Sequence, residues 1–162
     1  NNWIKSLTLK IKFPSTVIVN IKEKIPIGIY NNEQNEYYYL DHLGNKIDKA
    51  DKSNKENLII ILGKQSPSDI KKLIDSLNIK YNFQVKEAHF IGSRRWDIIL
   101  NNNLVIKLPE KQYSVALKKL NLFFLRIEEF DYSLIEYIDL RILNKAIIKF
   151  KNDYEIDLLN EM

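Results

Sequence analysis

The chain has 162 residues, 45% of them apolar and 28% charged, which is enough for one domain with a sizeable core and part of a second. Its formal net charge of +4 is spread among 21 acidic residues, so no continuous basic stripe indicates nucleic-acid binding. The absence of cysteine excludes disulfides, Cys-ligated zinc and thiol catalysis, and no apolar run reaches the ~18 residues typical of a membrane-spanning helix.

Residues 1–26 have the pattern of the end of a separate domain. Apolar and polar residues alternate on both sides of Phe13-Pro14-Ser15, which predicts a β-hairpin. The Pro-flanked segment 23–26 predicts a domain junction. Because the strand pattern starts almost at Asn1, we expect that the natural protein has a further N-terminal part.

Residues 27–151 have the pattern of a mixed domain. Strands are predicted near 27–30, 37–41, 58–62, 84–91, 95–100 and 104–108, with 58–62 buried on both faces and 48–57 in a polar surface loop. A proline and an acidic residue near the start of 66–77 predict a helix there, and an apolar stripe predicts another over about 110–127. Because helices and strands do not alternate regularly, we predict an α+β fold with a mostly antiparallel sheet and two principal helices.

The last predicted strand, residues 145–151, forms a hairpin with residues 137–141 and has no successor in the pattern. A strand at a sheet edge has unpaired backbone groups that can pair with another chain, so we predict a docking surface there. An acidic tail, residues 152–162, follows and mixes apolar with acidic residues. We predict that it docks partly beside the terminal strand and competes weakly with a partner.

Residues with catalytic potential are few. His42 and His89 have no partner at the spacing of a metal site or a triad, and the adjacent Glu128 and Glu129 do not converge from different directions. Four scattered glycines cannot build a phosphate-binding loop. An enzyme would need converging titratable groups in a concave site, so we predict no catalytic residue, no metal and no cofactor.

Four segments, in chain order, resemble the FtsQ/DivIB family of bacterial cell-division proteins. They are residues 3–27 with an aromatic-Pro turn, residues 40–45 with a D-x-x-G turn, residues 94–102 with a basic-Trp strand before an Asn-rich turn, and residues 137–141 with the pattern aromatic-aliphatic-Asp-Leu-Arg. The resemblance implies that residues 1–26 are the C-terminal strands of a POTRA domain. It also implies that residues 27–151 are an FtsQ-type β domain, followed by the acidic tail.

The function implied by this resemblance is that of a non-enzymatic scaffold of the divisome. Such a protein is held in the inner membrane at the division septum by a single helix, which lies outside this chain, and the present residues would be periplasmic. The implied partners are FtsB and FtsL, with FtsB adding a strand to the terminal edge.

The implied partner-binding residues centre on the terminal hairpin. Residue matching gives Tyr137 and Arg141, with Arg141 placed to meet an acidic residue of the partner. The edge strand and its turn add Ile142, Asn144, Lys145, Ala146, Ile147, Ile148, Lys149 and Phe150. A second basic contact is either Arg94 or a shifted residue, because Ser93 occupies the aligned position.

One alternative from the class of binding modules stays open. A POTRA-containing outer-membrane assembly or secretion factor would use the same edge to receive client strands. Tandem POTRA repeats or a C-terminal barrel with alternating strands would favour it, and neither pattern appears in these 162 residues. The oligomeric state is left open.

Overall fold

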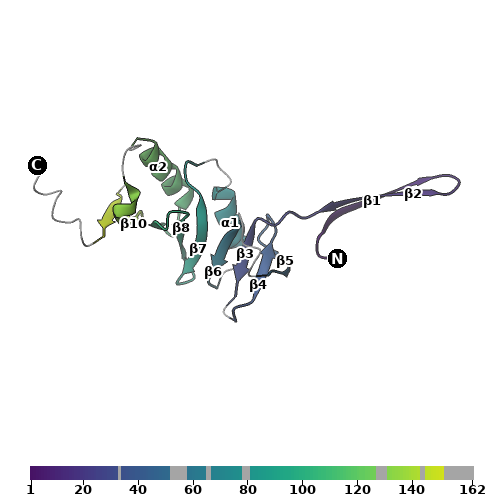
Figure 1. Cartoon of the computed structure of the whole chain (residues 1–162), viewed down its shortest axis with the longest axis horizontal. Helices are drawn as coiled ribbons and strands as arrows, with labels where there is room; N and C mark the ends of the chain where they lie inside the picture. The colour runs from purple at the N-terminus through teal and green to yellow at the C-terminus, as the bar shows by residue number, and fades with distance from the viewer. Residues whose placement is uncertain are drawn as a thin grey trace, which may run out of the picture.

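A computed structural model describes residues 1–32, 34–51, 58–64, 67–77, 81–126, 131–142 and 145–151. Its strands form two sheets, and the smaller one projects as a ribbon away from the larger one (Figure 1). The ribbon is the predicted N-terminal hairpin, in which β1 (Ile4–Lys12) pairs antiparallel with β2 (Thr16–Glu23).

The larger sheet has nine strands in the order β11-β10-β9-β8-β7-β6-β3-β4-β5. They are β3 (Gly28–Asn31), β4 (Tyr37–Leu40), β5 (Lys46–Lys49), β6 (Ile59–Leu62), β7 (Val85–Ile91), β8 (Arg95–Leu100), β9 (Val105–Lys107), β10 (Ile135–Asp139) and β11 (Ile147–Phe150). Five neighbouring pairs are antiparallel, and three are parallel: β10 with β9, and β6 with both β3 and β7.

Two helices, α1 (Pro67–Leu77) and α2 (Tyr113–Arg126), pack on one face of this sheet (Figure 1). The predicted fold class, α+β with a mostly antiparallel sheet and two principal helices, is confirmed. As predicted, α1 begins at a proline and has an acidic residue, Asp69, in its first turn. A short 3₁₀ helix, η1 (Tyr132–Leu134), leads into β10.

The core is built on a row of side chains that crosses five neighbouring strands. The register places opposite one another Ile61, Ala88, Ile98, Ile106 and Ile138, and each of them is at most 1% exposed. Leu73 of α1 and Leu117 of α2 are fully buried in the same cluster. Burying a Leu or Ile side chain contributes about 1.5–3 kcal/mol, so this row and the helices over it stabilise each other.

Three local predictions were wrong. α2 begins at Tyr113 and not near residue 110, because Gln112 has a left-handed φ of 57° and the first helical amides bond to its carbonyl. Residues 48 and 49 belong to β5, which the buried Ile47 anchors against β4. In β6 only Ile61 is fully buried, because the helices cover a single face of the sheet.

Some expectations fall on parts of the chain outside the described residues. These are Ser66 at the start of α1, the pair Glu128 and Glu129, Asn144 in the last turn, and the tail 152–162. Within the described part, no helix is both long enough and apolar enough to cross a membrane.

Gly63, which follows β6, is a position where only glycine fits. Its φ is +103°, and a Cβ built there would lie 2.7 Å from the Phe90 carbonyl oxygen. Gly63→Ala is expected to lower the free energy of unfolding by about 2–3 kcal/mol, measured by urea denaturation. Gly92→Ala is the matched control, because Gly92 also has a positive φ (+58°) but its Cβ would meet nothing nearer than 3.9 Å. The control should lose only about 1 kcal/mol, and equal losses would contradict the steric argument.

Candidate functional site

β11 lies at one edge of the larger sheet, as predicted, and β10 is its only strand neighbour within the described ranges. Two backbone hydrogen bonds show in which direction the N–H and C=O groups of β10 and β11 point. Lys151 N–H donates to the Leu134 carbonyl at 2.9 Å, and Leu140 N–H donates to the Lys107 carbonyl at 2.9 Å. Since backbone groups alternate along a strand, Ile148, which lies opposite Ile138, presents its N–H and C=O away from β10.

The opposite edge of the sheet, β5, is protected against strand addition. Three of its four residues are charged, and the Trp3 indole N–H donates to Asp48 Oδ2 at 3.1 Å while its ring packs edge-on against Tyr39. Short, charged and covered strands are the usual protection of a sheet edge. The two ends of this sheet are therefore not equivalent, and β11 is the end suited to pairing.

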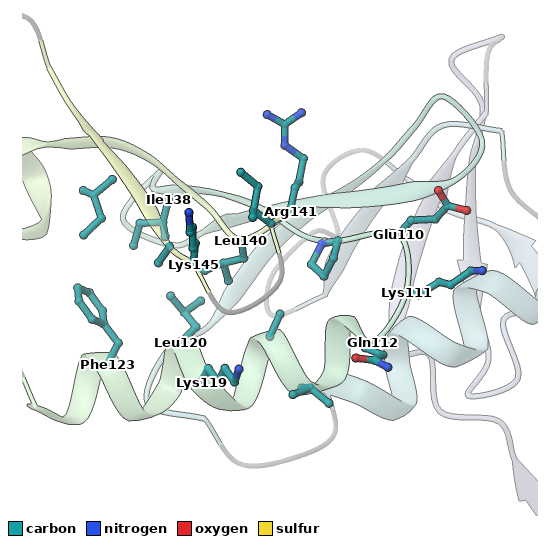
Figure 2. A pocket seen from close by; sticks show the side chains of 16 residues that line it. Glu110, Lys111, Gln112, Lys119, Leu120, Phe123, Ile138, Leu140, Arg141 and Lys145 are labelled. Carbon is teal, nitrogen blue, oxygen red and sulfur yellow. The ribbon is translucent and has the colours of Figure 1, made fainter.

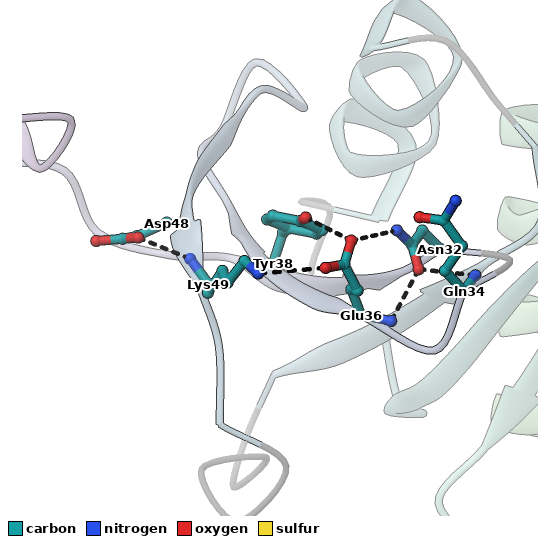
Figure 3. Close-up of polar contacts among 6 residues, drawn as sticks. All are labelled: Asn32, Gln34, Glu36, Tyr38, Asp48 and Lys49. Atoms are coloured by element: carbon teal, nitrogen blue, oxygen red, sulfur yellow. Dashed lines mark hydrogen bonds and ion pairs between the residues drawn. The ribbon is translucent and has the colours of Figure 1, made fainter.

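A polar network braces the protected edge (Figure 3). The Glu36 carboxylate accepts hydrogen bonds from the Tyr38 hydroxyl at 2.8 Å, from Lys49 Nζ at 3.2 Å and from Asn32 Nδ2 at 3.0 Å. The hydrogen bond from Tyr38, followed by those from Lys49 and Asn32, lowers the pKa of Glu36. This network connects β4 to β5, so the role of Glu36 is structural.

A groove of about 610 Å³ lies beside the other edge, between α2 and the β10–β11 hairpin (Figure 2). Its apolar lining comes from both sides: Val115, Ala116, Leu120 and Phe123 on α2, and Ile138, Leu140, Ile142, Ala146 and Ile148 on the hairpin. Its charged lining consists of Lys111, Lys119, Lys145, Arg141 and Glu110. Figure 2 shows the Arg141 guanidinium pointing away from α2, so this charge serves the other face of the sheet.

The helix-free face carries a row of polar and charged side chains. The register places His89, Asp97, Lys107 and Asp139 opposite one another on four successive strands. Beside this row, Lys107 Nζ lies 3.4 Å from the centroid of the Tyr137 ring, and Lys149 Nζ lies 5.8 Å from it. Both distances are within the range of cation–π contacts, so the Tyr137 ring interacts with two cations next to β11.

Asp139 and Arg141 form an ion pair near the edge that is held by several hydrogen bonds. Both carboxylate oxygens of Asp139 accept from Arg141 Nε at 2.9 Å, and Oδ1 also accepts from the Arg141 backbone N–H at 3.0 Å. The Asp139 side chain is only 9% exposed, whereas that of Arg141 is 44% exposed. The hydrogen bonds from Arg141 outweigh burial and lower the pKa of Asp139.

This ion pair changes the role expected for Arg141. The guanidinium has five N–H donors, and its bonds to Asp139 use Nε and one terminal nitrogen. Arg141 can therefore still receive a second carboxylate while it remains fixed by the first. A fixed cation loses less side-chain entropy when a partner binds.

The other predicted residues are spread around the edge. Lys145, Ala146, Ile147 and Ile142 are exposed, Ile148, Lys149 and Phe150 are half-buried, and Asn144 is outside the described part. Arg94 is exposed in the turn between β7 and β8, at the same end of the sheet as Arg141 but three strands from β11. Among the described ones, the structure therefore brings all except Arg94 into one patch.

Sequence reasoning missed several residues of this region. It assigned no role to Asp139, although the motif around it was noted, nor to Lys107 or to the α2 wall of the groove. The sequence signal for the α2 side of the groove was Val115, an apolar residue that lies outside the apolar stripe of this helix. Its side chain is 46% exposed.

Groups with catalytic potential do not converge in the described residues. His89 Nε2 lies 2.8 Å from Glu87 Oε2 as a neighbour on the same strand, and His42 is exposed in a turn. The described ranges contain no cluster of three or more His, Asp or Glu side chains that could hold a metal ion.

Comparison with known proteins gave a family match over most of the chain. The family model described as "Cell division protein FtsQ/DivIB, C-terminal" matches residues 28–141, so β11, which begins at Ile147, lies beyond the matched range. The cell division protein FtsQ of Rickettsia prowazekii is 32% identical over 152 residues, which cover 92% of this chain and 55% of that protein. FtsQ of Rhizobium meliloti is 26% identical over 120 residues, which cover 73% of this chain and 38% of that protein.

The chain thus spans about half the length of the Rickettsia relatives it matches. Among solved structures, the extracytoplasmic domain of DivIB from Geobacillus stearothermophilus aligns with a TM-score of 0.49 at 12% identity. That alignment covers 68% of this chain and 98% of the other.

The Asp139–Arg141 pair makes a testable contribution to stability. Arg141→Ala leaves a nearly buried carboxylate without its main donor, so the free energy of unfolding at pH 7 should fall by about 1–2 kcal/mol. Because the folded pKa of Asp139 is lowered, the stabilisation is complete above its unfolded pKa of about 3.9 and is lost as pH falls through the lower folded value. Urea denaturation at several pH values should therefore show the difference shrinking below about pH 4. Arg94→Ala, an exposed control, should stay within about 0.5 kcal/mol, and a pH-independent loss in Arg141→Ala would contradict the pairing.

Proposed function

This chain belongs to the FtsQ/DivIB family of cell division proteins, and from that premise we propose that it is a non-enzymatic scaffold of the divisome that binds FtsB by strand addition. In this proposal a strand of FtsB pairs with the outer edge of β11, and FtsL joins through its association with FtsB. The single observation that carries the proposal is the edge position of β11, with the backbone groups of Ile148 directed away from β10.

The backbone supplies affinity without special residues. Each main-chain hydrogen bond of an added strand contributes about 0.5–1.5 kcal/mol net. A four-residue edge strand offers only a few such bonds, so side chains must supply the rest of the affinity.

The side chains beside β11 favour a partner strand with two unlike faces. On the α2 side, alternate residues of the added strand would enter the apolar groove next to Ile148. On the helix-free side, they would lie near Lys107, Lys149 and Arg141, which favours acidic residues. An alternation of apolar and acidic residues is therefore the sequence that this edge selects.

Arg94 fits a role outside the added strand. It lies three inter-strand steps from β11, which is about 14 Å at ~4.8 Å per step. We propose that a segment of the partner flanking its strand reaches across this end of the sheet, so that Arg94 contacts an acidic side chain there. The exposure of Arg94 supports this assignment.

The proposal for residues 1–26 is that they are the last strands of a POTRA domain. In the β1–β2 ribbon, three opposing pairs make an apolar face: Leu7 with Ile21, Leu9 with Val19, and Ile11 with Val17. These six side chains are 50–81% exposed. An apolar face of this size normally packs against other elements, which the rest of a POTRA domain would supply. We further propose that a helix upstream of this domain anchors the protein in the inner membrane at the septum, with the present residues in the periplasm.

The first test of this function is calorimetric titration of the chain with a peptide from the membrane-distal part of FtsB of the same organism. We expect binding, and we expect amide exchange at Ile148 to slow at least tenfold when the peptide is added. The amides of Ile147 and Lys149 should change little, because they face β10. Binding that protects Ile147, Ile148 and Lys149 alike, or no binding, would contradict strand addition at this edge.

A second test addresses the ribbon. In residues 1–162, Leu9→Asp should leave the midpoint of thermal unfolding unchanged, because Leu9 is 59% exposed. In a protein that includes the upstream residues, the same change should destabilise the fold by about 2 kcal/mol or more, since it buries a charge in the core. Lys10→Asp on the polar face is the matched control and should be silent in both. An unchanged midpoint for Leu9→Asp in the longer protein would contradict the POTRA assignment.

A further inference from the structure

The groove and the open side of β11 hold no other part of the described chain, yet the chain continues directly past them. We propose that residues 153–162 of this same chain fold back along β11, set their apolar side chains into the groove and compete with the partner strand. The competition rests on the proposed function, whereas the docking does not depend on it.

The sequence of this segment has the two-faced alternation that the edge selects. Tyr154, Ile156 and Leu158 alternate with Glu155 and Asp157. Alternation of this kind is the pattern of a strand with one apolar and one acidic face. The segment has four acidic residues, at positions 153, 155, 157 and 161, and no basic one.

Charge and shape at the edge complement this pattern. Paired with β11, the apolar face would lie on the side of Ile148 and of Leu120 and Phe123 in the groove. Apart from Arg141, which points to the other face of the sheet, the charged residues that line the groove are three lysines (111, 119 and 145) and one carboxylate, Glu110, a net charge of 3 − 1 = +2.

The acidic face would lie on the helix-free side of the sheet. There, Lys107, Lys149, Arg141 and Arg95 are accompanied by the carboxylates of Glu136, Asp139 and Asp97, a net charge of 4 − 3 = +1. The three basic residues paired with these carboxylates keep their partners, so the segment is attracted by the summed field of the face and not by an unpaired cation.

The segment is also long enough to reach. The chain leaves β11 at Lys151, whose N–H is bonded to the Leu134 carbonyl. The four residues of β11 span about 13 Å at ~3.3 Å per residue, whereas residues 152–162 can extend over roughly 36 Å. After a reversal of about three residues, the remainder covers the full length of β11 in antiparallel direction.

Amide exchange in the absence of any partner tests the docking. We compare residues 1–162 with a form ending at residue 152, and we expect Ile148 to exchange at least fivefold more slowly in the longer form. Ile147 and Lys149, which face β10, should exchange alike in both. A full-length double variant, Glu155→Lys with Asp157→Lys, should exchange like the truncated form. Its control is Glu23→Lys with Asp75→Lys, which makes the same charge change at exposed positions outside the edge and should behave like the unmodified chain.

Each result decides one part of the proposal. Equal Ile148 exchange in the full-length and truncated forms overturns the docking. If docking holds, the FtsB peptide should bind the truncated form threefold to tenfold more tightly, and equal affinity overturns the competition. Slow Ile148 exchange combined with no peptide binding to either form would sink the proposed function and leave the docking standing.

Discussion

The buried row from Ile61 to Ile138 is the constraint on which the rest of the structure depends. It crosses five strands beneath α1 and α2, and each of its members is almost completely withdrawn from water. Ile148 continues this row onto β11, but it is only half-buried because the helices cover this strand less completely. The groove lies where the row of side chains extends beyond the part of the sheet that the helices cover closely. A partner or a segment of the chain that fills it completes a packing layer that the fold leaves open.

The two edges of the sheet differ in how well they are protected against strand addition. At β5, charges, the Glu36 network and the Trp3 indole occupy the edge. At β11, the sequence Ile147-Ile148-Lys149-Phe150 is a strand of mostly apolar character, with one neighbouring strand among the described residues. Unprotected edges of this kind promote unwanted pairing, so a protein that keeps one gains from a use for it. An acidic segment of the same chain would give that edge a weak occupant when no partner is bound.

The Asp139–Arg141 pair joins the stability of the strand end to a fixed surface charge. Asp139 is buried at the end of β10, and Arg141 supplies the hydrogen bonds that let it stay ionised there. The same guanidinium points to the helix-free side (Figure 2), and it has N–H donors that the bonds to Asp139 do not use. One side chain thus terminates the strand and presents a fixed positive charge, and the family match extends as far as this residue.

The sequence by itself determined the elements whose signal is local. Period-two alternation predicted the N-terminal hairpin and the terminal strand, the proline and acidic residue predicted α1, and the absence of a successor predicted that β11 lies at an edge. The family could also be inferred, because its motifs are short stretches in a fixed order. Only the tertiary structure decided the rest. The parallel pairs of β6, the charged row on the helix-free face and the groove all arise from the register between segments distant in the chain. The pairing of Arg141 with Asp139, although local in sequence, depends on the burial of Asp139. A local pattern carries no record of register or of burial by distant elements, since both are set by how the whole sheet packs beneath its helices.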